Sequence, residues 1–291
     1  MAIPYLDDLR LAHVLADTAD SLSMEKFGAQ DLQVSTKPDS TFVTESDKAV
    51  EASIRRTLKS ARSRDAVFGE EDGETAGSSG DTARRWIIDP IDATNNFMRG
   101  VPVWATLIGL EVEGEIVVGC VSAPALGRRW WASKEGGAHT GKSIMSSREM
   151  SVSKVRSLAD ASLSYSSLHG WDELGLTDAF RALTQECWRT RAYGDFWSYM
   201  LVAEGAVDLA AEPELSVWDM AALDVIVREA GGRFTGLNGE DGPWHANALA
   251  SNGRLHDAAL GYIGHFTDEA EEHGVVGNVH HIDFGGPGIE E

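Results

Sequence analysis

The segment 86–94 constrains this chain more than any other. The apolar residues 86–88 (WII) lead directly into Asp89, Pro90, Ile91 and Asp92. Proline fixes φ and has no backbone N–H to donate, so it suits the end of a strand, and the turn that follows can open a helix. Such a turn directs two carboxylates, a backbone carbonyl and helix N–H groups toward one point. The segment therefore predicts a strand at 86–89 that ends at a site able to bind a cation and a phosphate together.

Two further acidic motifs lie at similar places in the chain. Glu70 follows a short predicted strand at 67–68, and Asp219 begins a predicted helix. Together with Asp89 and Asp92 they form a set of hard oxygen ligands, which suits Mg²⁺ or Mn²⁺ rather than zinc. Taken singly, each motif has a simpler interpretation as a turn with a helix cap, a solvated acidic pair or a dipole-compensating charge. Four ionised carboxylates raise one another's pKa and need cations to share a site, so the combination favours a metal centre.

Composition narrows the possible partners of this chain. Its 291 residues have a net charge of −21, which argues against binding to nucleic acid or to anionic membranes, because both need a basic surface. A small phosphorylated substrate remains compatible, because a bound divalent cation inverts the local field. Cys120 and Cys187 lie in no metal-binding or CxxC spacing and are expected to be buried free thiols. The N-terminus does not resemble a signal peptide and no apolar run reaches the ~18 residues of a membrane span, so we expect a cytoplasmic protein.

Apolar periodicity predicts an α+β first half and an α/β second half. Helical spacing at 11–22 and 50–58, the second after a capping box at 44–47, precedes three β-rich runs that indicate an antiparallel meander. Residues 72–84 are expected to form a mobile loop or a hairpin. The meander runs are 104–112, 116–124 and 128–133; later strands are expected at 161–165, 207–211 and 248–250, and helices at 177–186, 196–204, 219–230 and 255–262.

These patterns suggest a division of the chain near residue 150. We expect residues 1–150 to form an N-terminal α+β half that holds the antiparallel sheet and the metal site. Residues 151–263 would form a C-terminal α/β half. Residues 264–291 are acidic and then glycine-rich, and we expect a disordered or loosely docked tail whose histidines are either solvated or bind a metal.

The three acidic motifs resemble the signature of the inositol monophosphatase family, and the resemblance covers roughly residues 5–262. It implies a layered αβαβα sandwich, a homodimer and a phosphomonoesterase that uses two or three Mg²⁺ ions. By position, Glu70, Asp89 and the Ile91 carbonyl would hold the first ion, and Asp89, Asp92 and Asp219 the second, with Glu70 also near a third. The other implied roles are water orientation by Thr94 with Asp47 or Glu70, phosphate binding by the N–H groups of Ala93 and Thr94, and substrate contacts from Asp195, Glu212 and Asp219.

Within this family the chain most resembles the actinobacterial histidinol-phosphate phosphatases, which act in histidine biosynthesis. An acid at Asp195 suits a cationic alcohol group such as that of histidinol phosphate, although Asp195 could instead cap the helix before Phe196. The alternatives are an inositol-1-monophosphatase or related phosphatase and a metal-binding pseudophosphatase. The last is motivated by Ala93 and Asn95, which replace the family's usual Gly and this branch's frequent Lys. The stretches that carry the resemblance are 99–105, 128–132, 191–196, 203–208, 211–213, 251–253 and 255–257.

Overall fold

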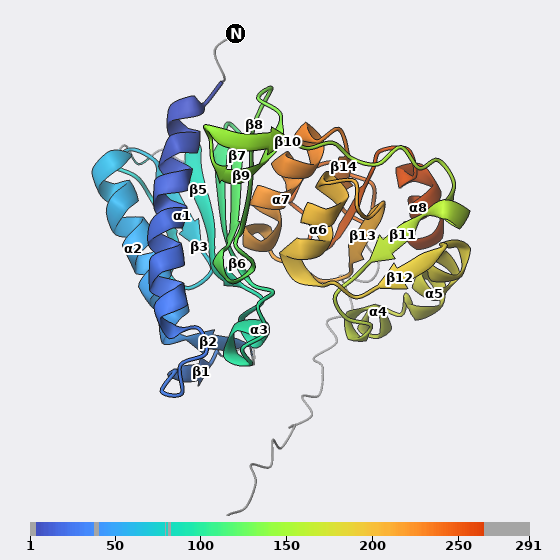
Figure 1. Ribbon diagram of the computed structural model, residues 1–291, viewed down its shortest axis with the longest axis horizontal. Helices are drawn as coiled ribbons and strands as arrows, with labels where there is room; N and C mark the ends of the chain where they lie inside the picture. Colours follow the sequence, from blue (N-terminus) through green and yellow to red (C-terminus); the bar gives the residue numbers. More distant parts are fainter. Residues whose placement is uncertain (1–3, 38–40, 79, 81–82, 265–291) are drawn as a thin grey trace, which may run out of the picture.

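The computed structural model describes residues 4–37, 41–78, 80 and 83–264 as five alternating layers of helix and sheet (Figure 1). The expected αβαβα sandwich is confirmed. The predicted tail lies outside the described residues apart from Gly264. The first layer contains α1 (Leu6–Lys26) and α2 (Glu45–Ala61), the third contains α6 (Asp195–Ala203) and α7 (Val217–Glu229), and the fifth contains α4 (His169–Glu173), α5 (Thr177–Glu186) and α8 (His256–Ile263).

The second layer is a sheet of eight strands in the order β10-β9-β8-β7-β6-β5-β3-β4. The predicted meander is confirmed, because β5 to β10 pair antiparallel in sequence. Among the described strands of this sheet, β3 and β5 form the one parallel pair. The strands are β3 (Ala66–Gly69), β4 (Gly73–Thr75), β5 (Arg84–Asp92), β6 (Ala105–Val112), β7 (Glu115–Ala123), β8 (Arg128–Ser133), β9 (Ala138–Ser143) and β10 (Ser146–Glu149).

The fourth layer is a five-stranded sheet in the order β12-β11-β13-β15-β14, which has both parallel and antiparallel pairs. A separate two-stranded hairpin, β1 with β2, lies beside the short helix α3 (Figure 1). The remaining elements are β1 (Val34–Thr36), β2 (Phe42–Thr44), α3 (Thr94–Met98), β11 (Ser162–Ser164), β12 (Arg189–Arg191), β13 (Leu209–Glu212), β14 (Arg233–Thr235), β15 (Ala248–Ser251) and the 3₁₀ turns η1 (Pro124–Leu126) and η2 (Leu158–Asp160).

Alternate residues of the central strands point to opposite sides of the large sheet, and helices cover both sides, so both faces are buried. Ile87 and Leu107 face α6 and α7, whereas Ile88 and Ile108 face α1 and α2. Helix α7 lies close to the strands, since a Cβ added to Gly119 would lie 2.5 Å from the Ala222 carbonyl oxygen. Glycine in the sheet therefore sets how near the helix, and the acid in its first turn, approach strand β5.

Several local predictions differ from the structure. Strand β5 continues past Pro90 to Asp92, because its pairing with β6 shifts register between Asp89 and Asp92 and so tolerates a residue that cannot donate. In the loop predicted at 72–84, Gly73–Thr75 pairs with β3, which supports the hairpin alternative. Strands β9 and β10 were not predicted. The boundary near residue 150 stays a prediction. Helices α6 and α7 come from the second half of the chain, but they share a core with the large sheet of the first half.

Cys120 is buried and Cys187 is partly buried, and both are free thiols. Among the described residues, no helix combines the length and apolar character needed to cross a membrane.

Candidate metal centre and substrate cavity

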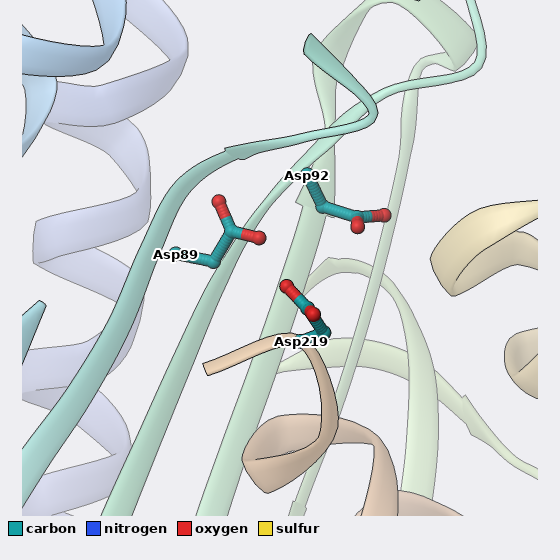
Figure 2. A group of neighbouring side chains, drawn as sticks. All are labelled: Asp89, Asp92 and Asp219. Carbon is teal, nitrogen blue, oxygen red and sulfur yellow. The ribbon is translucent and has the colours of Figure 1, made fainter. Parts of the chain in front are cut away.

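The carboxylates of Asp89, Asp92 and Asp219 lie near one another, at the end of β5 and the start of α7 (Figure 2). One oxygen from each lies within 4.8 Å of the others. Asp89 and Asp92 lie on either side of the register shift in β5, which lets both face the same point. Asp219 comes from the first turn of α7, where Ser216 and Asp219 form a capping box and Asp219 Oδ2 accepts the Ser216 N–H at 2.7 Å. Strand and helix capping geometry therefore place the three acids.

The electrostatics of this cluster favour a bound cation. Burial and the nearby Glu70, Asp92 and Asp219 raise the pKa of Asp89 well above its ordinary value. Burial, followed by Asp195 and Asp219, does the same to the pKa of Asp92, and burial raises the pKa of Asp219 to about 7. Asp89 Oδ1 is buried and has no hydrogen-bond partner among the described residues. An all-carboxylate set with an unpartnered oxygen fits a hard divalent cation.

Glu70 lies at the edge of this cluster and is paired with a lysine. Its Oε1 is 2.7 Å from Lys37 Nζ, which also lies 2.6 Å from Glu71 Oε1. Burial raises the pKa of Glu70, and Lys37 partly opposes this effect. Spacing alone could not have revealed Lys37, which is 33 positions from Glu70. This lysine neutralises part of the acidic surface next to the candidate metal centre.

Thr94 connects the cluster to Asp47. Its hydroxyl lies 3.0 Å from the Ile91 carbonyl oxygen and 3.3 Å from Asp47 Oδ1. Asp47 uses its other oxygen in the predicted capping box of α2, which is confirmed, and accepts the Thr44 N–H at 2.8 Å. Burial raises the pKa of Asp47 to about 6. The structure therefore brings together the two residues expected to orient water and the carbonyl expected to bind a cation.

A cavity of about 320 Å³ opens beside these groups. Ala93 lines it and has a left-handed conformation, with φ of 65°, immediately before α3. Phe97 anchors α3 by packing its ring edge-on against Trp104, with the ring centroids 4.9 Å apart. The cavity is lined by Thr41, Phe42, Glu70, Ala93, Thr94, Asn95, Asn96 and Asp195.

Asp195 begins α6 but does not cap it. The Phe196 N–H is accepted at 2.9 Å by Asp92 Oδ2, so the interpretation of Asp195 as the cap is wrong. Asp195 Oδ2 instead accepts from Asn96 Nδ2 at 3.1 Å, and burial raises the pKa of Asp195 to about 6. Asn96 was not predicted as a site residue, and no local pattern points to a contact across 99 positions.

Glu212 lies deeper, at the end of β13. It is 6% exposed, and its Oε1 has no hydrogen-bond partner among the described residues. Burial raises its pKa to about 8, and Asp195 and Asp219 add to this effect. Glu212 is not among the residues that line the cavity, although its charge interacts with those of Asp195 and Asp219.

A second cavity, of about 470 Å³, lies beside the C-terminal half of α7, away from the acidic cluster. Its arginines are already paired with acids: Arg228 with Asp224 at 2.8 Å and Arg233 with Asp241 at 3.4 Å. The first cavity differs, because its Asp195 carboxylate accepts from the neutral Asn96 and, among the described residues, forms no ion pair.

Comparison with known proteins agrees with this geometry. A sequence model described as the inositol monophosphatase family matches residues 7–267. The chain is 63% identical to a protein named histidinol-phosphatase from Streptomyces coelicolor, over 89% of this chain and 97% of that protein. It is 57% identical to a histidinol-phosphatase from Mycobacterium tuberculosis, over 87% of this chain and 96% of that protein.

The fold is also similar to that of a solved structure. The extragenic suppressor protein suhB of Bartonella henselae superposes with a TM-score of 0.79 at 28% identity, over 92% of this chain and all of that one. The family match, the two close relatives and the shared fold all cover nearly the whole described chain. This chain belongs to the inositol monophosphatase family, whose members are metal-dependent phosphatases.

Proposed function

We propose that this protein is a Mg²⁺-dependent phosphomonoesterase that hydrolyses L-histidinol phosphate to L-histidinol and phosphate in histidine biosynthesis. The observation that carries the proposal is the convergence of Asp89, Asp92 and Asp219 within 4.8 Å, next to a cavity that is lined by Glu70, Thr94 and Asp195. The names of the two close relatives support the choice of substrate. The substrate's phosphate would lie near the acids, and its cationic end near Asp195.

The residues that would hold the metal ions are Glu70, Asp89, Asp92, Asp219 and the carbonyl of Ile91. Bound Mg²⁺ would neutralise phosphoryl oxygens and lower the pKa of a water molecule, which is the chemistry that phosphate ester hydrolysis requires. Mn²⁺ suits the same oxygen ligands. Asp89 Oδ1 is buried and has no hydrogen-bond partner among the described residues, so it can bind a cation without giving up a hydrogen bond.

The remaining residues position the reactants. The Thr94 hydroxyl, held between the Ile91 carbonyl and Asp47, would orient the attacking water, and buried Asp47 would hold the proton that the threonine shares with it. Glu70 is the alternative partner of that water. The N–H groups of Ala93 and Thr94 at the start of α3 would donate to the phosphate, because the first N–H groups of a helix lack partners within it. Attack in line by water needs no covalent enzyme intermediate.

Asp195 and Glu212 would bind the alcohol part of the substrate and discriminate between alcohols. A carboxylate neutralises the ammonium or imidazolium of histidinol phosphate, whereas an inositol ring offers only neutral hydroxyls. Replacing Asp195 by asparagine keeps its size and its contact with Asn96 but removes the charge. We expect kcat/KM for histidinol phosphate to fall roughly tenfold to a hundredfold, the range of one charged hydrogen bond, with little change for inositol 1-phosphate.

The first experiment is to measure phosphate release from histidinol phosphate and from inositol 1-phosphate with Mg²⁺. Strong preference for histidinol phosphate supports the proposal. Preference for inositol 1-phosphate would favour the alternative inositol monophosphatase activity and contradict the argument from charge. Release from neither substrate by a protein that binds Mg²⁺ would favour a pseudophosphatase.

We also propose a cytoplasmic homodimer without nucleic-acid or membrane partners. The net charge of −21 supports the absence of polyanionic partners. Light scattering on the purified protein measures its mass in solution, and a monomer at micromolar concentration would contradict the dimer.

A further inference from the structure

Phe42 exposes a large apolar side chain inside the substrate cavity. It is 37% exposed and lines the cavity together with Asn96 and Asp195. The two residues that follow it in β2 are fixed, because Val43 is 4% exposed and Thr44 caps α2 with its side chain. The backbone of Phe42 is therefore held in place, and its exposed ring forms part of the cavity wall rather than of the core.

The same cavity is also lined by a carboxylate that is held in one orientation. Asp195 has a φ of 50°, a left-handed conformation that is rare for a residue other than glycine and that often marks a functional site. Its N–H donates to Ser166 Oγ at 2.8 Å, and its Oδ2 accepts from Asn96 at 3.1 Å. Among the described residues, the hydrogen bonds of this carboxylate involve Oδ2, which leaves Oδ1 for a ligand.

Asn96 is itself held in place. Its Nδ2 donates to the Val103 carbonyl oxygen at 2.8 Å as well as to Asp195, so both amide hydrogens are used. The amide can therefore rotate only by giving up two hydrogen bonds. Asn96 fixes the direction in which Asp195 faces, although it belongs to α3 and Asp195 to α6.

We propose that Phe42 is a specificity-determining residue: its ring selects a flat, cationic group on the alcohol part of the substrate, and Asn96 acts as the positioning residue for the carboxylate that neutralises that group. Aromatic faces attract cations and stack on flat rings, and a cavity of about 320 Å³ has room for a small ring and a phosphate. Saturated neutral alcohols gain neither the attraction of a cation to the ring face nor the stacking of flat rings. This inference rests on the proposed function and adds two residues to it.

The test compares histidinol phosphate with glycerol 1-phosphate, whose alcohol part is neutral and has no ring. For Phe42→Ala, we expect KM for histidinol phosphate to rise roughly tenfold, with kcat within about twofold, since the lost contact binds the substrate and not the reacting atoms. Values for glycerol 1-phosphate stay within about twofold. Phe42→Tyr retains the aromatic ring and restores KM. Val34→Ala is the matched control, because Val34 is 45% exposed on the same hairpin but does not line the cavity.

The role of Asn96 is tested by a double-mutant cycle. If Asn96 acts through Asp195, Asn96→Ala weakens histidinol phosphate binding in the wild-type background but adds nothing to Asp195→Asn. Additive losses would overturn the positioning role. Equal losses for both substrates in Phe42→Ala, or no loss for either, would overturn the role of Phe42. If the wild-type protein releases phosphate from glycerol 1-phosphate but not from histidinol phosphate, the proposed function fails and this inference fails with it.

Discussion

Replacing Asp219 by asparagine is expected to stabilise the metal-free protein while it abolishes phosphate release. Asp219 is half-buried beside Asp89 and Asp92, and its pKa is raised from 3.8 to about 7. A carboxyl group with a raised folded-state pKa binds protons more tightly in the folded protein. Its ionisation therefore destabilises the fold, and this destabilisation grows as the pH rises from the unfolded pKa to the folded one.

The magnitude follows from this difference in pKa. At pH 8 the difference between the folded and unfolded pKa of Asp219 lowers the free energy of unfolding by about 4 kcal/mol, at ~1.4 kcal/mol per pKa unit. Because the charge is shared with neighbouring acids that relax when one is neutralised, we expect Asp219→Asn to recover roughly 2–4 kcal/mol. The asparagine side-chain oxygen can still accept the Ser216 N–H, so the cap of α7 remains. For a chain of this size the gain corresponds to a rise in Tm of about 5–10 °C.

The assay is thermal unfolding followed by circular dichroism at pH 8 with a chelator, repeated with Mg²⁺. Without metal, the variant unfolds at a higher temperature than the wild type; added Mg²⁺ raises the wild-type Tm and raises that of the variant less. Phosphate release by the variant falls at least ~100-fold, because one ligand of the metal centre is lost.

Asp224→Asn is the matched control on the same helix. Asp224 is 1% exposed, but both of its oxygens accept from Arg228, at 2.8 and 2.9 Å. Burial raises the pKa of Asp224 too, but here Arg228 opposes that effect. Replacing Asp224 leaves the guanidinium without a carboxylate, which is expected to cost roughly 3 kcal/mol. If Asp219→Asn lowers the metal-free Tm as Asp224→Asn does, the acidic cluster is not electrostatically strained and the reasoning is refuted.

Three further predictions concern single residues. Ala93→Gly relieves a left-handed conformation that costs alanine about 1 kcal/mol, but it also makes the unfolded chain more flexible, so the free energy of unfolding changes by less than ~1 kcal/mol. We expect kcat for phosphate release to rise in this variant, and a fall in kcat would contradict the prediction. Thr94→Val lowers kcat about 100-fold and Thr94→Ser restores most of it, whereas equal activity of both variants would remove Thr94 from the mechanism. Burial lowers the pKa of His256 to about 4, so its stabilising contribution is complete above pH 6.5 and declines as the pH falls toward 4. Between pH 7 and pH 5 the free energy of unfolding that His256 contributes falls by about 2 kcal/mol. Urea unfolding at both pH values should show that His256→Gln reduces the difference in free energy of unfolding between them by that amount.

Elements with a local signal agreed best with the sequence. The capping box at the start of α2 and the meander of β6, β7 and β8 were predicted because caps and alternating apolar runs depend on neighbouring residues. Strands β9 and β10 were missed because most of their residues are exposed or half-buried and carry no apolar alternation. Helix α7 begins two residues before its predicted start because Ser216 is the cap.

The sequence by itself determined which acids would gather. Asp89 and Asp92 follow an apolar strand and Asp219 falls in the first turn of a helix, and these are local positions from which side chains reach the edge of a sheet. The tertiary structure alone decided what surrounds them: the pairing of Lys37 with Glu70, the cap that Asp92 provides to α6, and the contact of Asn96 with Asp195. These contacts join segments between 33 and 104 positions apart. The contacts of Asp92 and Asn96 with α6 depend on how that helix packs on the large sheet, which is a property of the whole core and not of any local pattern.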